Sequence, residues 1–118
     1  MIIKKLIKND AEDYRNIRLE ALHSNPDSFG TIYHEETITT VDNFRNRIPV
    51  NNNNFMLGCY DDKKLIGIVA FFQEERLKLQ HKAYIRSMYV KQEYRRKGIG
   101  KLLVQELIEK AKAIANFS

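Results

Sequence analysis

The segment from Lys91 to Lys101 gathers residue types suited to binding an anionic group. Against one anion, Glu93, it holds five cations: Lys91, Arg95, Arg96, Lys97 and Lys101. Its central part reads Arg95-Arg96-Lys97-Gly98-Ile99-Gly100-Lys101. Glycines let a phosphate approach the backbone closely, and guanidinium and ammonium groups donate charge-assisted hydrogen bonds to it. The segment therefore predicts a phosphate or diphosphate site.

The flanking residues predict that this segment joins a strand to a helix. Residues 83–90 have strand character, and after the glycines six apolar residues recur with a period near 3.6: Ile99, Leu102, Leu103, Leu107, Ala111 and Ile114. The first N–H groups of a helix lack internal partners, and the helix dipole adds positive charge there. An ordinary helix start beside a solvated basic surface is the alternative. A phosphate site accounts for strand, glycines, cations and helix together.

Two other phosphate-binding loops match the segment less well. A Walker A loop needs a glycine separated by four residues from its Gly-Lys pair, and Ser or Thr after that pair; Arg95 and Leu102 stand at these two positions. The dinucleotide fingerprint needs Gly or Ala at the position of Leu103.

The N-terminal half is predicted to contain one strand and two helices. Residues 2–7 form the strand, and Asp10 caps a helix whose buried positions are Ala11, Tyr14, Ile17 and Ala21. That helix ends near Asn25-Pro26-Asp27, because the residue before proline avoids helical geometry. After a polar stretch, a second helix begins at Thr40 or Asp42, buries Phe44 and Ile48, and ends at Pro49.

Three further strands are predicted before the basic segment. The four asparagines at 51–54 form a loop, and residues 55–60 and 65–72 form a hairpin around Asp61-Asp62-Lys63-Lys64. Residues 65–72 are apolar on both faces, which is typical of a central strand covered on each side. With residues 83–90 as the fourth strand, the order is β-α-α-β-β-β-α in a single domain, residues 1–118.

Composition limits the class of protein. The chain has 118 residues, 43% hydrophobic and 30% charged, with a net charge of +5, which favours anionic partners. It has no apolar run near the roughly 20 residues needed to span a bilayer, and no signal peptide, so we expect a cytoplasmic protein without a membrane partner. Cys59 is predicted to be buried, and His23, His34 and His81 to be surface residues, so no metal site is expected.

The strand and basic segment together resemble a known family signature. The stretch Ile85-Arg86-Ser87-Met88-Tyr89-Val90-Lys91-Gln92-Glu93-Tyr94-Arg95-Arg96-Lys97-Gly98-Ile99-Gly100 is similar to the core motif of the GCN5-related N-acetyltransferases, or GNAT family. That motif is an apolar strand, a short loop, then Arg/Gln-x-x-Gly-x-Gly/Ala opening a helix. Residues 18–22 and 25–29 resemble the family more weakly. The implied fold is α/β, with a mixed, mostly antiparallel central sheet flanked by helices.

The resemblance also implies a function and a set of binding residues. The cosubstrate would be acetyl-CoA, and its acetyl group would pass to a primary amine of a small molecule or peptide, without a metal. Backbone groups of Met88, Tyr89 and Val90 would face the pantetheine arm, and Arg95 fills the Arg/Gln position. Amides of the following residues would hold the diphosphate: Arg96, Lys97, Gly98, Ile99, Gly100 and Lys101.

The catalytic residues are not identified by the resemblance. Several family members carry a glutamate base on the fourth strand, where this chain has Tyr84, whose phenol is a poor base at neutral pH. We interpret Tyr84 as a core residue or a pocket wall. Glu74 and Glu75 are candidates through water, although solvated surface charge is the simpler interpretation.

The chain ends where the family's fifth strand would begin, so we expect it to contain the first portion of the family's fold. An open edge on the fourth strand would then favour a homo-oligomer. Two other functions stay open: a CoA-binding module without catalysis, and a basic nucleic-acid-binding domain. The last is not favoured, because Tyr89 and Tyr94 are the only aromatic residues among these cations.

Overall fold

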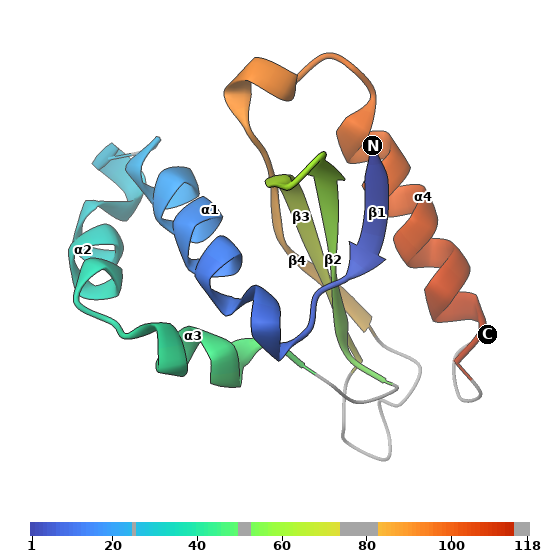
Figure 1. Ribbon diagram of the computed structural model, residues 1–118, viewed down its shortest axis with the longest axis horizontal. Helices are drawn as coiled ribbons and strands as arrows, with labels where there is room; N and C mark the ends of the chain where they lie inside the picture. Colours follow the sequence, from blue (N-terminus) through green and yellow to red (C-terminus); the bar gives the residue numbers. More distant parts are fainter. Residues whose placement is uncertain (25, 50–52, 74–82, 115–118) are drawn as a thin grey trace.

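Four strands form one sheet in which every neighbouring pair is antiparallel and the spatial order follows the chain (Figure 1). The strands are β1 (Ile2–Lys5), β2 (Phe55–Asp61), β3 (Lys64–Gln73) and β4 (Ala83–Val90). The computed structural model describes residues 1–24, 26–49, 53–73 and 83–114. Within these residues each strand is hydrogen-bonded to the strand that follows it in the sequence, and β4 lies at one edge of the sheet.

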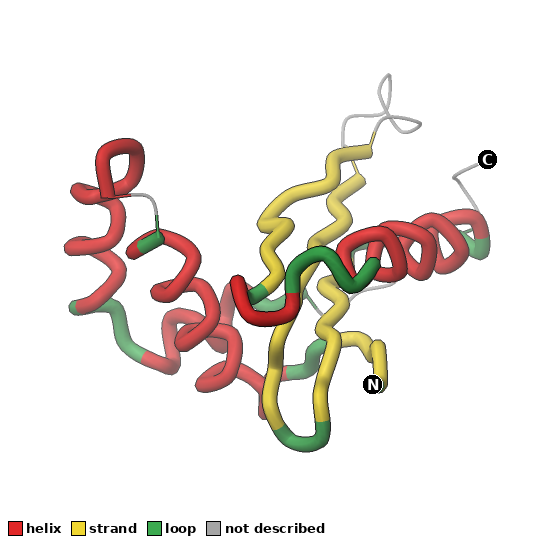
Figure 2. The backbone as a smooth tube through the Cα atoms, turned by 90° about the horizontal axis from the view of Figure 1, so that it is seen from above, coloured by secondary structure: helices red, strands yellow, loops and turns green. Residues whose placement is uncertain are grey.

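Helices cover both faces of the sheet. Three of them, α1 (Ala11–His23), α2 (Pro26–Thr37) and α3 (Val41–Arg47), lie on one side, and α4 (Ile99–Lys112) lies on the other (Figures 1 and 2). The segment from β4 to α4 crosses the end of the sheet at the top of Figure 1. It therefore carries the chain from the edge strand to the face opposite α1.

The strand β3 separates the two halves of the hydrophobic core. Its residues Leu65, Ile68 and Ala70 pack with α1 and α3, where the rings of Tyr14 and Phe44 meet edge to face at 5.5 Å between centroids. Its other face packs with α4 through a second set of buried residues: Ile66, Val69, Phe71, Ile99, Leu103, Leu107 and Ala111. The prediction of a central strand covered on both sides is confirmed.

The predicted fold class is confirmed, but the predicted element order lacks one helix. The stretch after Asn25-Pro26-Asp27 was expected to be irregular, and it forms α2. Pro26 is the first helical residue, a position where its missing N–H costs nothing and its fixed φ suits the helix. The order is therefore β-α-α-α-β-β-β-α.

Several local predictions can be compared with the structure. Thr40 caps α3 by accepting a hydrogen bond from the Asn43 N–H at 3.1 Å, and Phe44 and Ile48 are fully buried, as predicted. Asp10 precedes α1, but its side chain does not cap that helix. Its carboxylate instead accepts the Ile7 N–H at 2.8 Å, so it closes the turn before the helix.

The predictions of which side chains are buried and which are exposed were correct for most of the residues concerned. Cys59 is buried, and burial raises the pKa of its thiol; His23 and His34 are exposed. The predictions for His81 and for Asn51 and Asn52 lie outside the described residues. Leu102, which was expected on the buried face of α4, is 51% exposed, because that face is narrower than the apolar pattern suggests.

Candidate functional site

A bulge interrupts β4 just before its end. Ile68 of β3 faces Tyr89 and Ala70 faces Arg86, so β4 contains one residue more than β3 over this interval. Ser87, within it, has a φ of 57°, which a residue other than glycine rarely adopts. Such a bulge disrupts the ladder of hydrogen bonds and turns the strand. Backbone groups at Ser87–Met88 are therefore not held in a regular ladder with β3.

The connection from β4 to α4 ends in a left-handed glycine. The Lys91 N–H donates to the Ile66 carbonyl at 2.9 Å, and a single turn at Gln92–Tyr94 follows. Gly98, with φ 78°, precedes the first helical residue, and the Leu102 N–H makes the first intrahelical bond to the Gly98 carbonyl at 3.0 Å. The amides of residues 99–101 therefore lie at the open end of the helix.

A cavity of about 280 Å³ opens at this junction, lined by Val90, Tyr94, Arg95, Arg96, Gly98, Ile99 and Gly100. The Ile99 side chain is buried in the core, so this residue contributes its backbone to the site. A Cβ at Gly100 would lie 3.0 Å from the Met88 Cε. A side chain at position 100 would therefore crowd Met88 beside the open end of α4.

The predicted binding residues are divided between two places. Val90, Arg95, Arg96, Gly98, Ile99 and Gly100 share the junction cavity, whereas Met88 and Tyr89 line a separate cavity near the bulge. Lys97 and Lys101 line neither of these two cavities. Both are exposed, and the Lys97 Nζ lies 5.5 Å from the Tyr94 ring centroid.

Arg95 connects the loop to the strand. Its Nε donates to the Val90 carbonyl at 2.9 Å, and its guanidinium lies 5.3 Å from the centroid of the Tyr89 ring. Arg95 therefore holds the wall of the cavity in place, and the exposed Arg96 is the freer cation for an incoming anion.

Two tyrosines fasten the site to the rest of the fold, and sequence reasoning gave neither this role. The Tyr94 hydroxyl donates to Asp61 Oδ2 at 2.6 Å, a hydrogen bond that raises the pKa of Tyr94. The Tyr89 hydroxyl donates to Glu20 Oε2 at 2.9 Å, and burial raises the pKa of Tyr89. These contacts tie the loop to the β2–β3 turn and β4 to α1. Their partners are far apart in sequence, so no local pattern predicts them.

No general base is identified among the described residues. Tyr84 is 42% exposed, so the interpretation of Tyr84 as a core residue is wrong; its ring lies 5.3 Å from the Arg86 guanidinium. Glu74 and Glu75 lie outside the described residues. In the described part of the chain, no group of three or more His, Cys, Asp or Glu residues is placed to hold a metal ion. No helix among these residues is long and apolar enough to cross a membrane.

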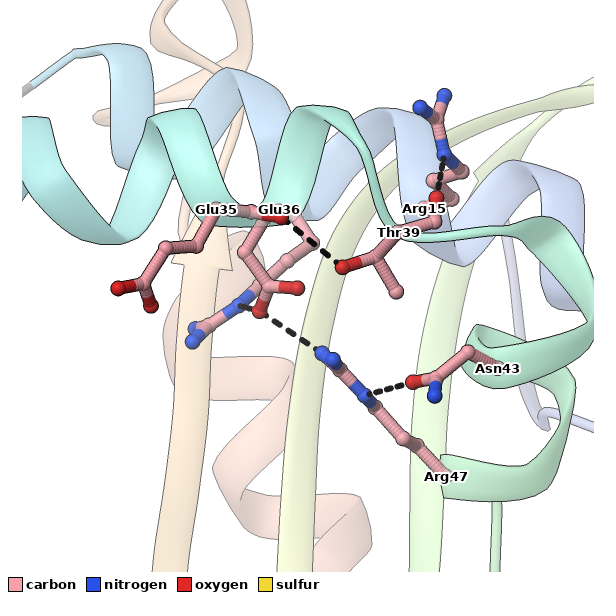
Figure 3. Close-up of polar contacts among 7 residues, drawn as sticks. Arg15, Glu35, Glu36, Thr39, Asn43 and Arg47 are labelled. Carbon is pink, nitrogen blue, oxygen red and sulfur yellow. Dashed lines mark hydrogen bonds and ion pairs between the residues drawn. The ribbon is translucent and has the colours of Figure 1, made fainter.

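A buried carboxylate joins α1, α2 and α3. Glu36 of α2 accepts a hydrogen bond from Arg47 of α3 at 2.8 Å (Figure 3). The same Glu36 oxygen lies 3.7 Å from Arg18 Nε of α1. Arg47 in turn donates to Asn43 Oδ1 at 3.0 Å. The hydrogen bond from Arg47 is the main reason that the pKa of Glu36 is lowered, and it outweighs the opposing effect of burial.

Replacing Glu36 with glutamine is expected to lower the free energy of unfolding at pH 7 by about 1–3 kcal/mol, because a charge-assisted hydrogen bond is lost and two guanidiniums lose their anion. Both arginine side chains are about a third exposed, which keeps the loss below that of a fully buried pair. The folded pKa of Glu36 lies below the ordinary value, so its stabilisation is present above that value and is lost as pH falls through the folded pKa.

Urea unfolding of both proteins at pH 7 and at successive pH values below 4.5 tests this. The difference in the free energy of unfolding between wild type and Glu36→Gln should become smaller as the pH falls. A difference that is the same at every pH would show that the charge of Glu36 contributes nothing.

Comparison with known proteins identifies the family. The model of the Acetyltransferase (GNAT) family matches residues 11–117, which is most of the chain. This chain therefore belongs to the GNAT acetyltransferase family. A search of curated proteins gave no match.

Solved structures show the same fold. A GNAT-family acetyltransferase from Streptococcus pneumoniae superposes with a TM-score of 0.74 at 21% identity, over 98% of this chain and 69% of that one. A ribosomal-protein-alanine N-acetyltransferase from Brucella melitensis gives 0.67 at 22%, over 98% and 74%. The PaiA N-acetyltransferase from Thermoplasma acidophilum, in complex with coenzyme A, gives 0.67 at 21%, over 94% and 71%. At these identities the likeness supports the fold alone.

Proposed function

We propose that this chain binds acetyl-CoA along β4 and at the N-terminus of α4, and transfers the acetyl group to a primary amine. The single observation that carries this proposal is the junction cavity, where the left-handed Gly98, the open amides of α4 and the cations Arg95 and Arg96 meet. That combination of donors, positive charge and cleared backbone suits a diphosphate. Family membership supports acetyl transfer as the reaction.

In the proposed reaction, the deprotonated amine attacks the thioester carbonyl, the C–N bond forms and the C–S bond breaks. The amine loses a proton and the departing thiolate takes one up. The chain's own contribution is to hold the two ends of the cosubstrate: cations and helix amides at the junction, and irregular backbone at Ser87–Met88 further along β4. Backbone amides freed from the ladder can polarise a carbonyl, as in other oxyanion sites.

Calorimetric titration with CoA, dephospho-CoA and adenosine tests the binding step. CoA and dephospho-CoA share the diphosphate, so both should bind, and adenosine should bind far more weakly. A thiol-release assay with acetyl-CoA and mixed amines then tests transfer. Binding without transfer would favour a CoA-binding module. Equal binding of all three ligands would contradict the diphosphate site.

Arg96→Ala is expected to weaken CoA binding about three- to tenfold at about 50 mM salt, and less than about twofold at about 0.5 M salt, because exposed charges are screened at short range in concentrated salt. Arg96 is the suitable residue because it lines the cavity and is exposed. Lys112→Ala removes an exposed cation at the other end of α4 and should change affinity at neither concentration. An equal loss for Arg96→Ala at both salt concentrations would mean that Arg96 acts through packing.

We also propose that the part of β4 before the bulge pairs with the same part of a second copy, which leaves the Ser87–Val90 part for the cosubstrate. Among the described strands β4 has a neighbour on one side alone, and Tyr84 and Ile85 on it are 42% and 51% exposed. An apolar strand edge of this kind favours pairing between chains. Ile85→Lys is expected to shift sedimentation toward the monomer, whereas Ile38→Lys, at a site 84% exposed outside the sheet, should leave it unchanged. A wild-type monomer at all concentrations would exclude this pairing.

A further inference from the structure

A second cavity, of about 200 Å³, lies between α1, α2 and the bulged part of β4. Leu22, Ile32 and Ile68 contribute apolar side chains, and the β4 residues Ser87 and Met88 form one side. Val90, two residues further along β4, already lines the junction cavity. A molecule that lies along β4 with its phosphates at the junction therefore extends toward this second cavity.

One charged residue, Arg18, lines this cavity. Its nearest anion is Glu36, but that carboxylate is shared: Arg47 bonds to it at 2.8 Å, while Arg18 Nε stays at 3.7 Å (Figure 3 shows Glu36 and Arg47). Two guanidiniums against one carboxylate leave a net positive charge. Glu20, a second acidic side chain near this wall among the described residues, is itself paired with Lys91 at 3.2 Å. The electrostatic character of the cavity is therefore positive.

Arg18 keeps part of its side chain open to the cavity. Its Nε is buried beside Glu36 and makes no hydrogen bond within the described residues, but the side chain as a whole is 30% exposed. A guanidinium has five N–H donors, so Arg18 can donate to an acceptor that enters the cavity. A carboxylate is the best-matched acceptor, because guanidinium and carboxylate form charge-assisted hydrogen bonds.

From this arrangement we propose that the cavity takes an amine acceptor that carries a carboxylate, which Arg18 binds, while the amine faces the Ser87–Met88 segment of β4. The volume is below the roughly 300–1,000 Å³ of sites for drug-sized ligands, which favours a small acceptor or the acidic end of a larger one. The apolar wall accommodates the methylene chain between the two groups. A polycationic acceptor is disfavoured by the like charge of Arg18. This inference rests on the proposed acetyl transfer.

Matched acceptors test the proposal. The probes are β-alanine and 4-aminobutyrate, the corresponding neutral amides, and 1,4-diaminobutane as the cationic member. Thiol release from acetyl-CoA gives kcat/KM, and the shift in melting temperature with CoA present gives binding without turnover. The carboxylates are expected to exceed the amides by about tenfold or more in kcat/KM, the effect of one charge-assisted hydrogen bond. A carboxylate in the acceptor raises the pKa of its amine and so favours the protonated, unreactive form. This effect lowers kcat/KM for the carboxylates and therefore works against the expected preference.

Variants separate recognition by Arg18 from its part in stability. Arg18→Gln should lower kcat/KM for the carboxylates to about that of the amides and leave CoA affinity unchanged, whereas Arg18→Lys should keep part of the preference. Arg47→Gln is the matched control, since it removes a guanidinium from the same ion cluster but does not line the cavity. It should lower the melting temperature and keep the preference.

Three results would overturn the inference: amides or the diamine preferred by the wild type, an equal loss for both acceptor classes in Arg18→Gln, or no melting shift with any acceptor while CoA binds. Failure of the proposed function has a different signature, namely no binding of CoA itself. The two failures are therefore distinguishable.

Discussion

Leu103→Ala is expected to lower the free energy of unfolding by about 2–5 kcal/mol, whereas Leu102→Ala should change it by about 0.5 kcal/mol or less. The two residues are adjacent on α4 and change identically, so helix propensity is matched. Leu103 is 0% exposed, and a Cβ on Gly67 would lie 3.1 Å from its Cδ1; Leu102 is 51% exposed. Truncating Leu103 therefore opens a cavity where β3 and α4 meet.

Urea denaturation of the two variants beside the wild type measures this difference. The slope of the unfolding free energy against urea should be unchanged, which would show that the loss is in the folded state. Equal losses at the two positions would mean that α4 does not pack on the sheet through Leu103.

The largest expected effect on binding is that of Gly100→Val, which we expect to weaken CoA binding by about 100-fold or more. A side chain at this position would meet Met88 Cε at 3.0 Å, and Gly100 is one of the residues that line the cavity at the open end of α4. Charge-assisted hydrogen bonds contribute about 1.5–3 kcal/mol each, so losing access to two of them is sufficient. Gly98 is less suitable, since any side chain there is strained by φ 78° whether or not a ligand binds.

Calorimetry with CoA tests this change, with Leu103→Ala as the control for stability. That variant should be less stable than wild type and still bind CoA with affinity within about threefold. Retention of CoA affinity in Gly100→Val would place the diphosphate elsewhere.

The strand, loop and helix that make up the candidate site were predictable because their signals are local. The glycines, the cations and the periodic apolar residues of α4 all fall within one short stretch, so residue type and spacing were sufficient to predict a strand, a loop and a helix. The bounds of the two hairpin strands, β2 and β3, were predicted within a residue or two for the same reason.

The errors arose where distant residues decide the outcome. Asn25-Pro26-Asp27 has the composition of a loop. Pro26 can be interpreted as the first residue of α2 only once residues 26–37 are known to be helical. Leu102 fits the helical period but is 51% exposed, because Ile99, Leu103, Leu107 and Ala111 alone form the buried face of α4. The contacts of Tyr89 with Glu20 and of Glu36 with Arg47 join separate elements. No regular spacing of residues in the sequence indicates such contacts.

The order of strands has a consequence for how this chain folds. The β2–β3 hairpin needs only the turn at Asp62–Lys63, whereas β1 must bring Ile2 to Tyr60, more than fifty positions away. The entropy of loop closure grows with the length of chain enclosed, and local contacts form fastest. The hairpin can therefore form early and serve as the template on which β1 docks, after the intervening helices have shortened the loop that must close.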